Sequence, residues 1–314
     1  MASVLSAKHF HDEAAAYAFV EARVWPEGPI CPHCGGVERI GKLKGKSTRL
    51  GVYKCYQCRK PFTVKVGTVF EASHIPLHIW LQGIALLTSS KKGISTNQLH
   101  RVLGITLKAA WFMSHRVREA MRAGSLAPMG GAGGIVEADE TYFGNRKIRR
   151  THTTAGRPFL KGGKAAQKRA IVALVERGGE VRSFHVENAD KATVNKIVTE
   201  NLDRESRLFT DESKLYGDAA GFAAGHETVR HSAKEYVRGE VHTNTIEGVF
   251  SILKRGMQGV YQHCSEKHLH RYLAEFDFRY NARVALGVND QARADRALLG
   301  IVGKRLTYRT TRAG

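Results

Sequence analysis

Acidic residues are scarce in this sequence. Its 314 residues include 29 Asp and Glu against 49 Lys and Arg, so the formal net charge is +20. An imbalance of this size is typical of a protein with a polyanionic partner, most often nucleic acid. The alternative is a surface that is basic for solubility alone. For a chain this basic, we favour the nucleic-acid partner.

Long apolar runs are also missing. No stretch reaches the roughly 18 consecutive apolar residues of a transmembrane helix, so a spanning segment is excluded. The first residues, MASVLSAKHFHDEAAAY, do not join a basic flank to an apolar core as a secretory signal does. Internal repeats and low-complexity tracts are absent too. We therefore expect a cytoplasmic protein with reduced thiols.

Cysteine occurs only five times, but four of these residues form two close pairs. Cys31 and Cys34 stand in CPHC, Cys55 and Cys58 stand in CYQC, and residues 35–54 separate the pairs. In a reducing compartment, C-x2-C pairs favour a metal over disulfides. Four thiolates at this spacing can complete the tetrahedral shell of a structural zinc ion. We predict one zinc ribbon with these ligands; the alternative is two unrelated pairs of buried cysteines.

Residues 73–128 have the pattern of a small helical region. Apolar residues recur at helical spacing in three segments, which are 76–90, 94–104 and 105–121. The second and third segments, joined at Gly104, resemble a helix-turn-helix. Such a unit either reads DNA or only packs and dimerises. If it reads DNA, we expect Lys108, Arg116 and Arg118 to contact phosphates.

Four glycines in residues 129–134 mark a linker, after which the pattern changes. Eight elements are predicted after this linker. A strand at 133–143 is followed by two strands within 169–187, a helix at 189–202 and a strand at 206–211. A helix at 212–223, a strand at 226–232 and a helix at 243–257 complete the order. This order matches the ribonuclease H-like fold, a mixed sheet covered by helices. We therefore predict an α+β multidomain protein. An N-terminal helix and zinc ribbon occupy residues 1–72, and a helix-turn-helix-like region occupies residues 73–128. A ribonuclease H-like domain follows at 129–290, and a basic tail at 291–314.

A strongly basic segment lies between the first two predicted strands of that domain. Residues 146–169 contain nine Lys or Arg and no acid. Such a segment is either a solvated loop or an arm that holds a nucleic-acid backbone by releasing its counterions. We predict the second, with Arg149, Arg150 and Lys168 among the contacts.

Three carboxylates stand together in the apolar strand IVEADETYFG, residues 135–144. Because side chains alternate along a strand, Glu137 and Asp139 share one face and Glu140 lies on the other. Buried charge is costly unless something pairs with it. Acids in such a strand therefore require an explanation.

Two further acids complete the pattern. Asp211 ends a neighbouring strand, and Glu247 lies in the first turn of the helix that begins near Asn244. A ribonuclease H-like sheet brings these positions to one edge together with Asp139. Taken singly, Asp211 could only cap the next helix, and Glu247 could only complement a helix dipole.

Converging carboxylates repel one another unless cations neutralise them. Hard oxygen ligands suit Mg²⁺ or Mn²⁺. Two such ions about 3.5–4 Å apart can activate an attacking oxygen and stabilise a leaving oxygen at phosphorus. The acids thus predict a two-ion site, and the basic remainder of the chain predicts the phosphate polymer on which the site acts.

From about residue 10 to about residue 285, the chain resembles the IS1595-type, or ISXO2-like, transposases of bacterial insertion sequences. The similar segments are WPEGPICPHCGG, YKCYQCRKPFTVKVGTVFE, KAAWFMSHRVREAM, VEADETYFG, TDESKLY, HTNTIEGVFSILKRGMQGVYQH and EFDFRYNAR. Together these segments are highly specific.

The resemblance implies a DDE transposase. Its N-terminal regions bind the ends of the element as double-stranded DNA, and its catalytic domain cuts those ends and joins them to target DNA. The implied triad is Asp139, Asp211 and Glu247, with Lys254 on the DNA backbone and 35 residues between the last two acids. Two bound Mg²⁺ or Mn²⁺ ions, a homodimer or larger oligomer, and a location at the bacterial nucleoid follow from the same resemblance.

Three points stay open at this stage. Relatives can carry Asn in place of the third acid, and Asn244 shares a helix face with Glu247; charge and the spacing to Lys254 favour Glu247. A DNA-binding regulator with an inert ribonuclease H-like platform is one alternative function. A structure-specific nuclease, which cuts without joining, is the other.

Overall fold

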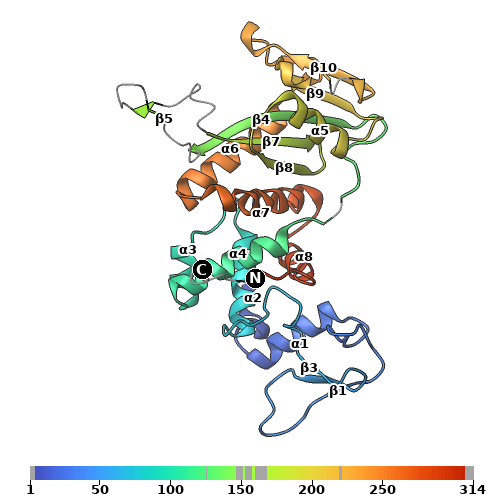
Figure 1. The fold of residues 1–314 in the computed structure, drawn as a ribbon, viewed down its shortest axis with the longest axis vertical. Coiled ribbons are helices and arrows are strands. Elements are labelled where there is room, and N and C mark those ends of the chain that lie inside the picture. Colours follow the sequence, from blue (N-terminus) through green and yellow to red (C-terminus); the bar gives the residue numbers. More distant parts are fainter. Residues whose placement is uncertain are drawn as a thin grey trace. The chain divides into compact units, whose positions relative to one another are not determined.

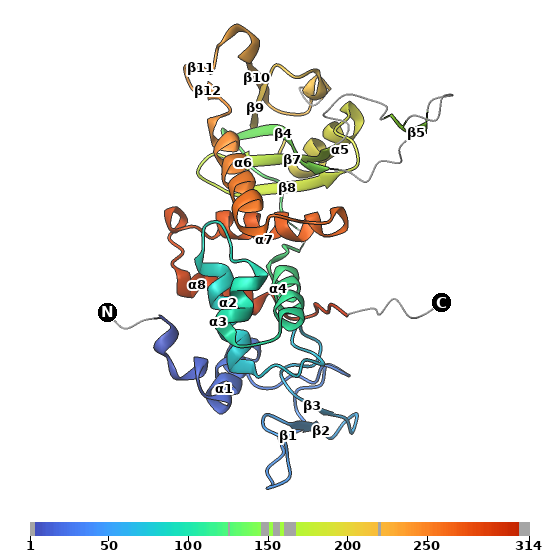
Figure 2. The same ribbon diagram turned by 90° about the vertical axis from the view of Figure 1, so that its left-hand side faces the viewer.

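The computed structural model describes residues 4–124, 126–145, 151–152, 158–159, 168–218 and 221–307 (Figures 1 and 2). The chain forms two compact units, Met1–Arg122 with Ala282–Gly314, and Ala123–Asn281. The last helical segment thus belongs to the same unit as the zinc-ribbon region, whereas we expected the second unit to continue to residue 290. Within the described residues, no helix has the length and apolar character needed to cross a membrane.

The first unit begins with helix α1 and a small ribbon. Helix α1 (Glu13–Val24) begins at Asp12, whose side chain accepts a hydrogen bond from the Ala15 backbone at 2.6 Å. The strands β1 (Ile40–Lys42), β2 (Tyr53–Cys55) and β3 (Pro61–Phe62) form an antiparallel sheet in that order. Few apolar side chains gather around the cysteines here, so the ribbon has little core of its own.

Four helices complete this unit. They are α2 (Leu77–Ser89), α3 (Thr96–Leu103), α4 (Leu107–Met121) and α8 (Asp290–Leu299). The side chains of Ser95 and Thr106 cap α3 and α4, and Gly104 ends α3 with a φ of 64° that few residues other than glycine adopt. The predicted helix, glycine turn and second helix are therefore confirmed.

Helix α8 replaces part of the basic tail that we expected at 291–314. Three of its five apolar residues are alanines, and Arg293 is buried together with Ala297 and Leu298. The Arg293 guanidinium donates to the carbonyl oxygens of Ala282 and Thr88, at 2.7 and 3.2 Å. A buried cation that satisfies backbone carbonyls has no apolar signature in the sequence, and this is why the helix was missed. Residues 308–314 lie outside the described residues.

The second unit contains a five-stranded sheet with the order β10-β9-β4-β7-β8. Its strands are β4 (Ile135–Asn145), β7 (Lys168–Glu176), β8 (Val181–Val186), β9 (Arg207–Asp211) and β10 (Gly225–Val229). Strands β4, β7 and β8 pair antiparallel, while β9 pairs parallel with both β4 and β10. This is the ribonuclease H-like topology, and it confirms the predicted fold class.

Helices cover both faces of this sheet (Figure 2). Helices α6 (Asn244–Gly256) and α7 (Leu269–Asn281) bury one face, and α5 (Lys191–Asn201) buries the other. Val136 and Ala138 of β4 belong to the core on the α5 side. Because side chains alternate, Glu137 and Asp139 lie together on the α6 side; that the two share a face was predicted, and the structure adds which face it is.

Short elements fill the connections. The hairpin of β11 (Val237–Arg238) and β12 (Val241–His242) precedes α6, and β5 (Thr151–His152) pairs with β6 (Pro158–Phe159). A π-helix covers Met257–Tyr261, and short 3-10 turns cover Val4–Ser6, Lys8–Phe10, Lys214–Tyr216, His231–Ala233, Glu266–His268 and Val284–Leu286. Where we expected a helix over 212–223, the described residues thus contain the turn at Lys214–Tyr216, begun by Ser213.

Candidate active site

Two parallel strands bring the first two predicted acids together. Strand β4 pairs with β9 up to Glu137 and Phe209. Asp139 and Asp211 each lie two residues beyond that last pair, on adjacent strands. The carboxylate of Asp211 accepts a hydrogen bond from the Ser213 backbone at 3.0 Å, which turns the chain away from the sheet.

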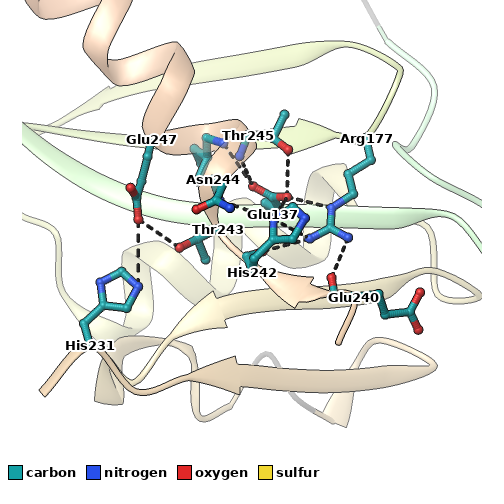
Figure 3. A network of polar contacts seen from close by, with 10 residues as sticks. Glu137, Arg177, His231, Glu240, His242, Thr243, Asn244, Thr245 and Glu247 are labelled. Carbon is teal, nitrogen blue, oxygen red and sulfur yellow. Dashed lines mark hydrogen bonds and ion pairs between the residues drawn. The ribbon is translucent and has the colours of Figure 1, made fainter. Parts of the chain in front are cut away.

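Helix α6 supplies the third acid. Glu247 stands in its first turn, and its side chain is 47% exposed. The carboxylate accepts a hydrogen bond from the Thr243 hydroxyl at 3.2 Å and lies 3.8 Å from the His231 ring (Figure 3). Asn244, the alternative third ligand, is exposed at the first residue of the helix.

The pKa of Asp139 reflects both its burial and the charges of the other acids nearby. Burial raises the pKa of Asp139 to about 7, and the charges of Glu140, Asp211 and Glu247 act in the same direction. Each neighbouring carboxylate disfavours the ionised form of Asp139. The site therefore gathers negative charge at one edge of the sheet.

Glu140 lies beside the triad but is held from the other face of β4. Its carboxylate accepts from the Tyr216 hydroxyl at 3.0 Å and lies 3.5 Å from the Ser213 hydroxyl, which also donates to it. Burial raises the pKa of Glu140, the Tyr216 hydrogen bond opposes this shift, and Asp211 adds to it. The sequence placed Glu140 on this face without indicating these partners.

A cleft of about 370 Å³ opens between β4 and α6. Three acids and two bases line it together with three neutral residues: Asp139, Glu140, Glu247, Lys254, Arg255, Thr141, Phe250 and Ser251. Lys254 lies two helical turns after Glu247, as predicted, and is exposed. One wall can therefore hold cations while the other attracts a phosphate backbone.

The donor chemistry of this cleft fits hard divalent cations. The three carboxylates that line it, Asp139, Glu140 and Glu247, offer oxygen ligands, which suit Mg²⁺ or Mn²⁺. Within the part of the chain that the structure describes, the tight clusters of three or more potential ligands are limited to the cysteines, so the acids stand wider apart than a cage around one ion.

The four predicted zinc ligands converge in the first unit. The Sγ atoms of Cys31, Cys34, Cys55 and Cys58 all lie within 4.8 Å of one another. The separations of Cys31 from Cys58 and of Cys34 from Cys55 are 3.6 and 3.7 Å. Tetrahedral Zn–S bonds of about 2.3 Å place sulfur atoms about 3.8 Å apart, so this set fits a zinc ion.

The predicted phosphate contacts have mixed outcomes. Lys108 is exposed in the first turn of α4, and Lys168 is exposed at the start of β7. Arg149 and Arg150 lie outside the described residues.

Arg116 is a correction. Its side chain is 4% exposed and donates to the carbonyl oxygens of Val69, Glu71 and Leu306, at 2.7, 2.8 and 3.2 Å. Arg118, at 1% exposed, is buried as well. Both arginines belong to the interior of the first unit, because α4 packs against α2, α3 and α8 over most of its length. The fully exposed residues of α4, Leu107 and Lys108, lie in its first turn.

Sequence reasoning missed the residues that hold the acids in place. Glu137 was noticed as an acid in an apolar strand, but its partner Arg177 carried no signal. Ser213 and Tyr216 belong to the segment TDESKLY, which indicated only a family resemblance.

Comparisons with known proteins agree with this architecture. The ISXO2-like transposase domain family matches residues 131–281, and the transposase zinc-ribbon domain family matches residues 11–61. A protein of Halobacterium salinarum, described as an uncharacterized protein in transposable element ISH50, is 30% identical over 283 residues. That similarity covers 87% of this chain and 92% of the relative.

Two similar solved structures are the strand transfer complex of Mos1 and the Mos1 transposase paired-end complex with the left transposon end. Each is 12% identical and covers 66% of this chain and 77% of the Mos1 chain, with TM-scores of 0.23 and 0.22. Scores this low do not bear on the fold, which rests on the strand order described above. Both family matches and the halobacterial relative establish the classification: the chain belongs to the IS1595-type, ISXO2-like transposase family of insertion sequences.

Proposed function

We propose that this transposase binds the ends of its element as double-stranded DNA, cuts them, and joins the 3′ ends to target DNA. The observation that carries the proposal is the cleft in which Asp139 and Glu247 face Lys254 and Arg255. Acids alone would repel DNA, and bases alone would bind it without chemistry. Both together suit phosphoryl transfer at a bound backbone.

In this proposal, Asp139, Asp211 and Glu247 hold two divalent cations, and Lys254 holds the phosphate backbone. The cations would supply activation of the attacking oxygen and stabilisation of the leaving oxygen. Water first forms a bond to phosphorus while the bond to the 3′ oxygen breaks, which leaves a 3′-OH. That hydroxyl then forms a bond to a target phosphorus while a target P–O bond breaks, so no covalent protein intermediate is required.

The first unit serves recognition in the same proposal. A zinc ion bound by the four cysteines would hold the ribbon in shape, since the ribbon has little core of its own. Lys108 and the basic arm at 146–169 supply contacts to phosphates. Two ends must be paired, so we expect at least a homodimer, working at the nucleoid in the cytoplasm.

Strand transfer on a pre-cleaved end tests the triad. Glu247→Gln, Asp139→Asn and Asp211→Asn should each lower Mg²⁺-dependent joining by more than the roughly 10- to 100-fold that outer-shell changes cost. DNA-end binding should persist, because the altered groups hold cations rather than DNA. Asn244→Ala, on the same helix turn, should only slow the reaction.

The same assay distinguishes the alternatives. Near-normal joining by the Glu247→Gln protein would remove Glu247 from the triad and make Asn244 the first candidate. Cleavage without joining by the wild-type protein would indicate a nuclease. Binding with neither reaction would indicate a regulator.

A further inference from the structure

Glu137 is a fully buried carboxylate at the centre of a polar network (Figure 3). Its Oε2 accepts the backbone N–H groups of Thr245 and Ile246, at 2.9 and 3.0 Å. Its Oε1 accepts the Thr245 hydroxyl at 2.8 Å and Arg177 Nε at 2.7 Å. Each oxygen thus already accepts two hydrogen bonds, which leaves no lone pair for a metal ion.

These bonds cap helix α6. The preceding residue, Thr243, makes no capping bond with its side chain, which instead donates to Glu247. The first N–H groups of a helix need a partner and favour a negative charge. Glu137 therefore supplies, from a different element, the cap that the helix itself lacks.

Arg177 holds this carboxylate and the strand before α6 at the same time. Besides its ion pair with Glu137, its guanidinium donates to the carbonyl oxygens of Glu240 and His242, at 2.7 and 2.9 Å. The same Nη2 donates to the His242 ring at 2.9 Å. The start of α6 is thereby tied to β4 both directly and through β12.

We infer that Glu137 is a positioning residue for the catalytic site. It lies two residues before Asp139 on the same face of β4, a distance of about 7 Å along the strand. One strand thus carries an acid of the triad and the anchor of the helix that carries Glu247. The network fixes the spacing between these acids, so it sets how tightly they hold divalent cations. This inference rests on the proposed function, since it takes Glu247 as part of the triad.

Glu137→Gln tests the inference. A glutamine keeps one oxygen for the two backbone N–H groups but turns an NH₂ group toward Arg177, which cannot accept from it. We expect a rise on the order of 10- to 100-fold in the Mn²⁺ concentration for half-saturation, measured by the electron paramagnetic resonance of free Mn²⁺ with the DNA-bound protein. The Mg²⁺ concentration for half-maximal joining should rise in parallel, while DNA-end binding stays unchanged.

Asp277→Asn is the matched control. It makes the same change, from carboxylate to amide, at a partly buried site where α7 meets β8; there Asp277 accepts from the backbone and hydroxyl of Ser183, at 2.8 and 2.7 Å. Its Mn²⁺ and Mg²⁺ titrations should match the wild type. Equal titrations for the Glu137→Gln and Asp277→Asn proteins would overturn the inference and leave Glu137 a purely structural residue.

A milder variant covers the case in which Glu137→Gln does not fold. Thr245→Val removes only the hydroxyl bond and keeps the backbone cap, so it should shift both titrations in the same direction by a smaller factor. An unchanged Thr245→Val protein, with Glu137→Gln unfolded, would also contradict the inference. Failure of the proposed function would give a different result from failure of this inference. In that case the wild-type protein would show no metal-dependent joining, or the Glu247→Gln protein would retain it.

Discussion

At the scale of single residues, the sequence predicted the strand face of a side chain better than its burial and hydrogen-bond partners. Strand alternation placed Asp139 and Glu137 on one face of β4, and the structure agrees. The predicted phosphate contact of Arg116 was wrong. A sequence does not distinguish an arginine that faces DNA from one that donates to buried carbonyl oxygens. Burial of a cation depends on helices distant in the sequence, here including α8, so local patterning could not reveal it.

The partly buried carboxylate of Asp277 provides a prediction at this scale. Burial raises its pKa to about 7, against the hydrogen bonds from Ser183. Between about pH 4 and pH 7 the unfolded chain loses this proton while the folded protein keeps it, so stability falls as the pH rises. The shift corresponds to a loss on the order of 4 kcal/mol, fully present above pH 7.

Asp277→Asn should remove this contribution, because an amide does not titrate. Urea unfolding midpoints measured from pH 4 to pH 8 should therefore fall less with pH in the variant than in the wild type. Asp218→Asn, which alters a surface ion pair with Lys191, is the control and should keep the wild-type slope. Identical slopes in all three proteins would show that Asp277 titrates normally.

At the scale of elements, the predictions succeeded where local chemistry was sufficient. Side-chain caps at Ser95 and Thr106 and the left-handed Gly104 delimit α3 and α4 as the sequence indicated. They failed where an element depends on tertiary contacts. Among the described residues after Asp211, a short turn at Lys214–Tyr216 stands where a long helix was expected; Tyr216 is buried there, and its hydroxyl donates to Glu140. The cap of α6 comes from Glu137 on strand β4, which is distant in the sequence.

The zinc ribbon provides the prediction at this scale. Cys55→Ser replaces a buried thiol of the four-sulfur set, and a serine hydroxyl is a poor zinc ligand at neutral pH. Because the ribbon has little core of its own, loss of the ion should unfold it locally and weaken DNA-end binding. Metal analysis of the purified protein should fall from one zinc per chain to nearly none.

Cys264→Ser is the control, since this fifth cysteine lies in the second unit. It should retain one zinc per chain. Joining by the acidic site with high concentrations of a pre-cleaved end should persist in both variants. Full zinc occupancy in Cys55→Ser would contradict the assignment of the four ligands.

At the scale of the whole molecule, charge and fold predict the partner together. The net charge of +20 indicates a polyanion but says nothing of chemistry. The strand order supplies a sheet edge at which distant acids meet, and the cleft brings Lys254 beside them. Composition could not reveal the division into two units, because residues 282–307 return to the first unit through contacts such as the Arg293 side chain with the Thr88 carbonyl.

The basic segment 146–169 leads to the last prediction, which concerns the binding of DNA by the whole protein. Each phosphate contact releases counterions, so the logarithm of the binding constant falls with the logarithm of salt by about 0.9 per contact. Neutralising Arg149, Arg150 and Lys168 together to glutamine should flatten this slope by up to about 0.9 for each of these side chains that holds a phosphate. Sequence preference should be unchanged, because backbone contacts carry no base information.

A change in net charge alone could also alter the slope, so a control of equal charge is required. Lys191, Lys196 and Arg204 are exposed at helix α5 and the turn after it, and α5 covers the face of the sheet opposite α6. Neutralising these three residues removes the same charge from a surface away from the cleft. The slope should then stay near the wild-type value. If both triple variants shift the slope equally, the segment acts only through the overall field of the protein; if neither does, it makes no contact with the backbone.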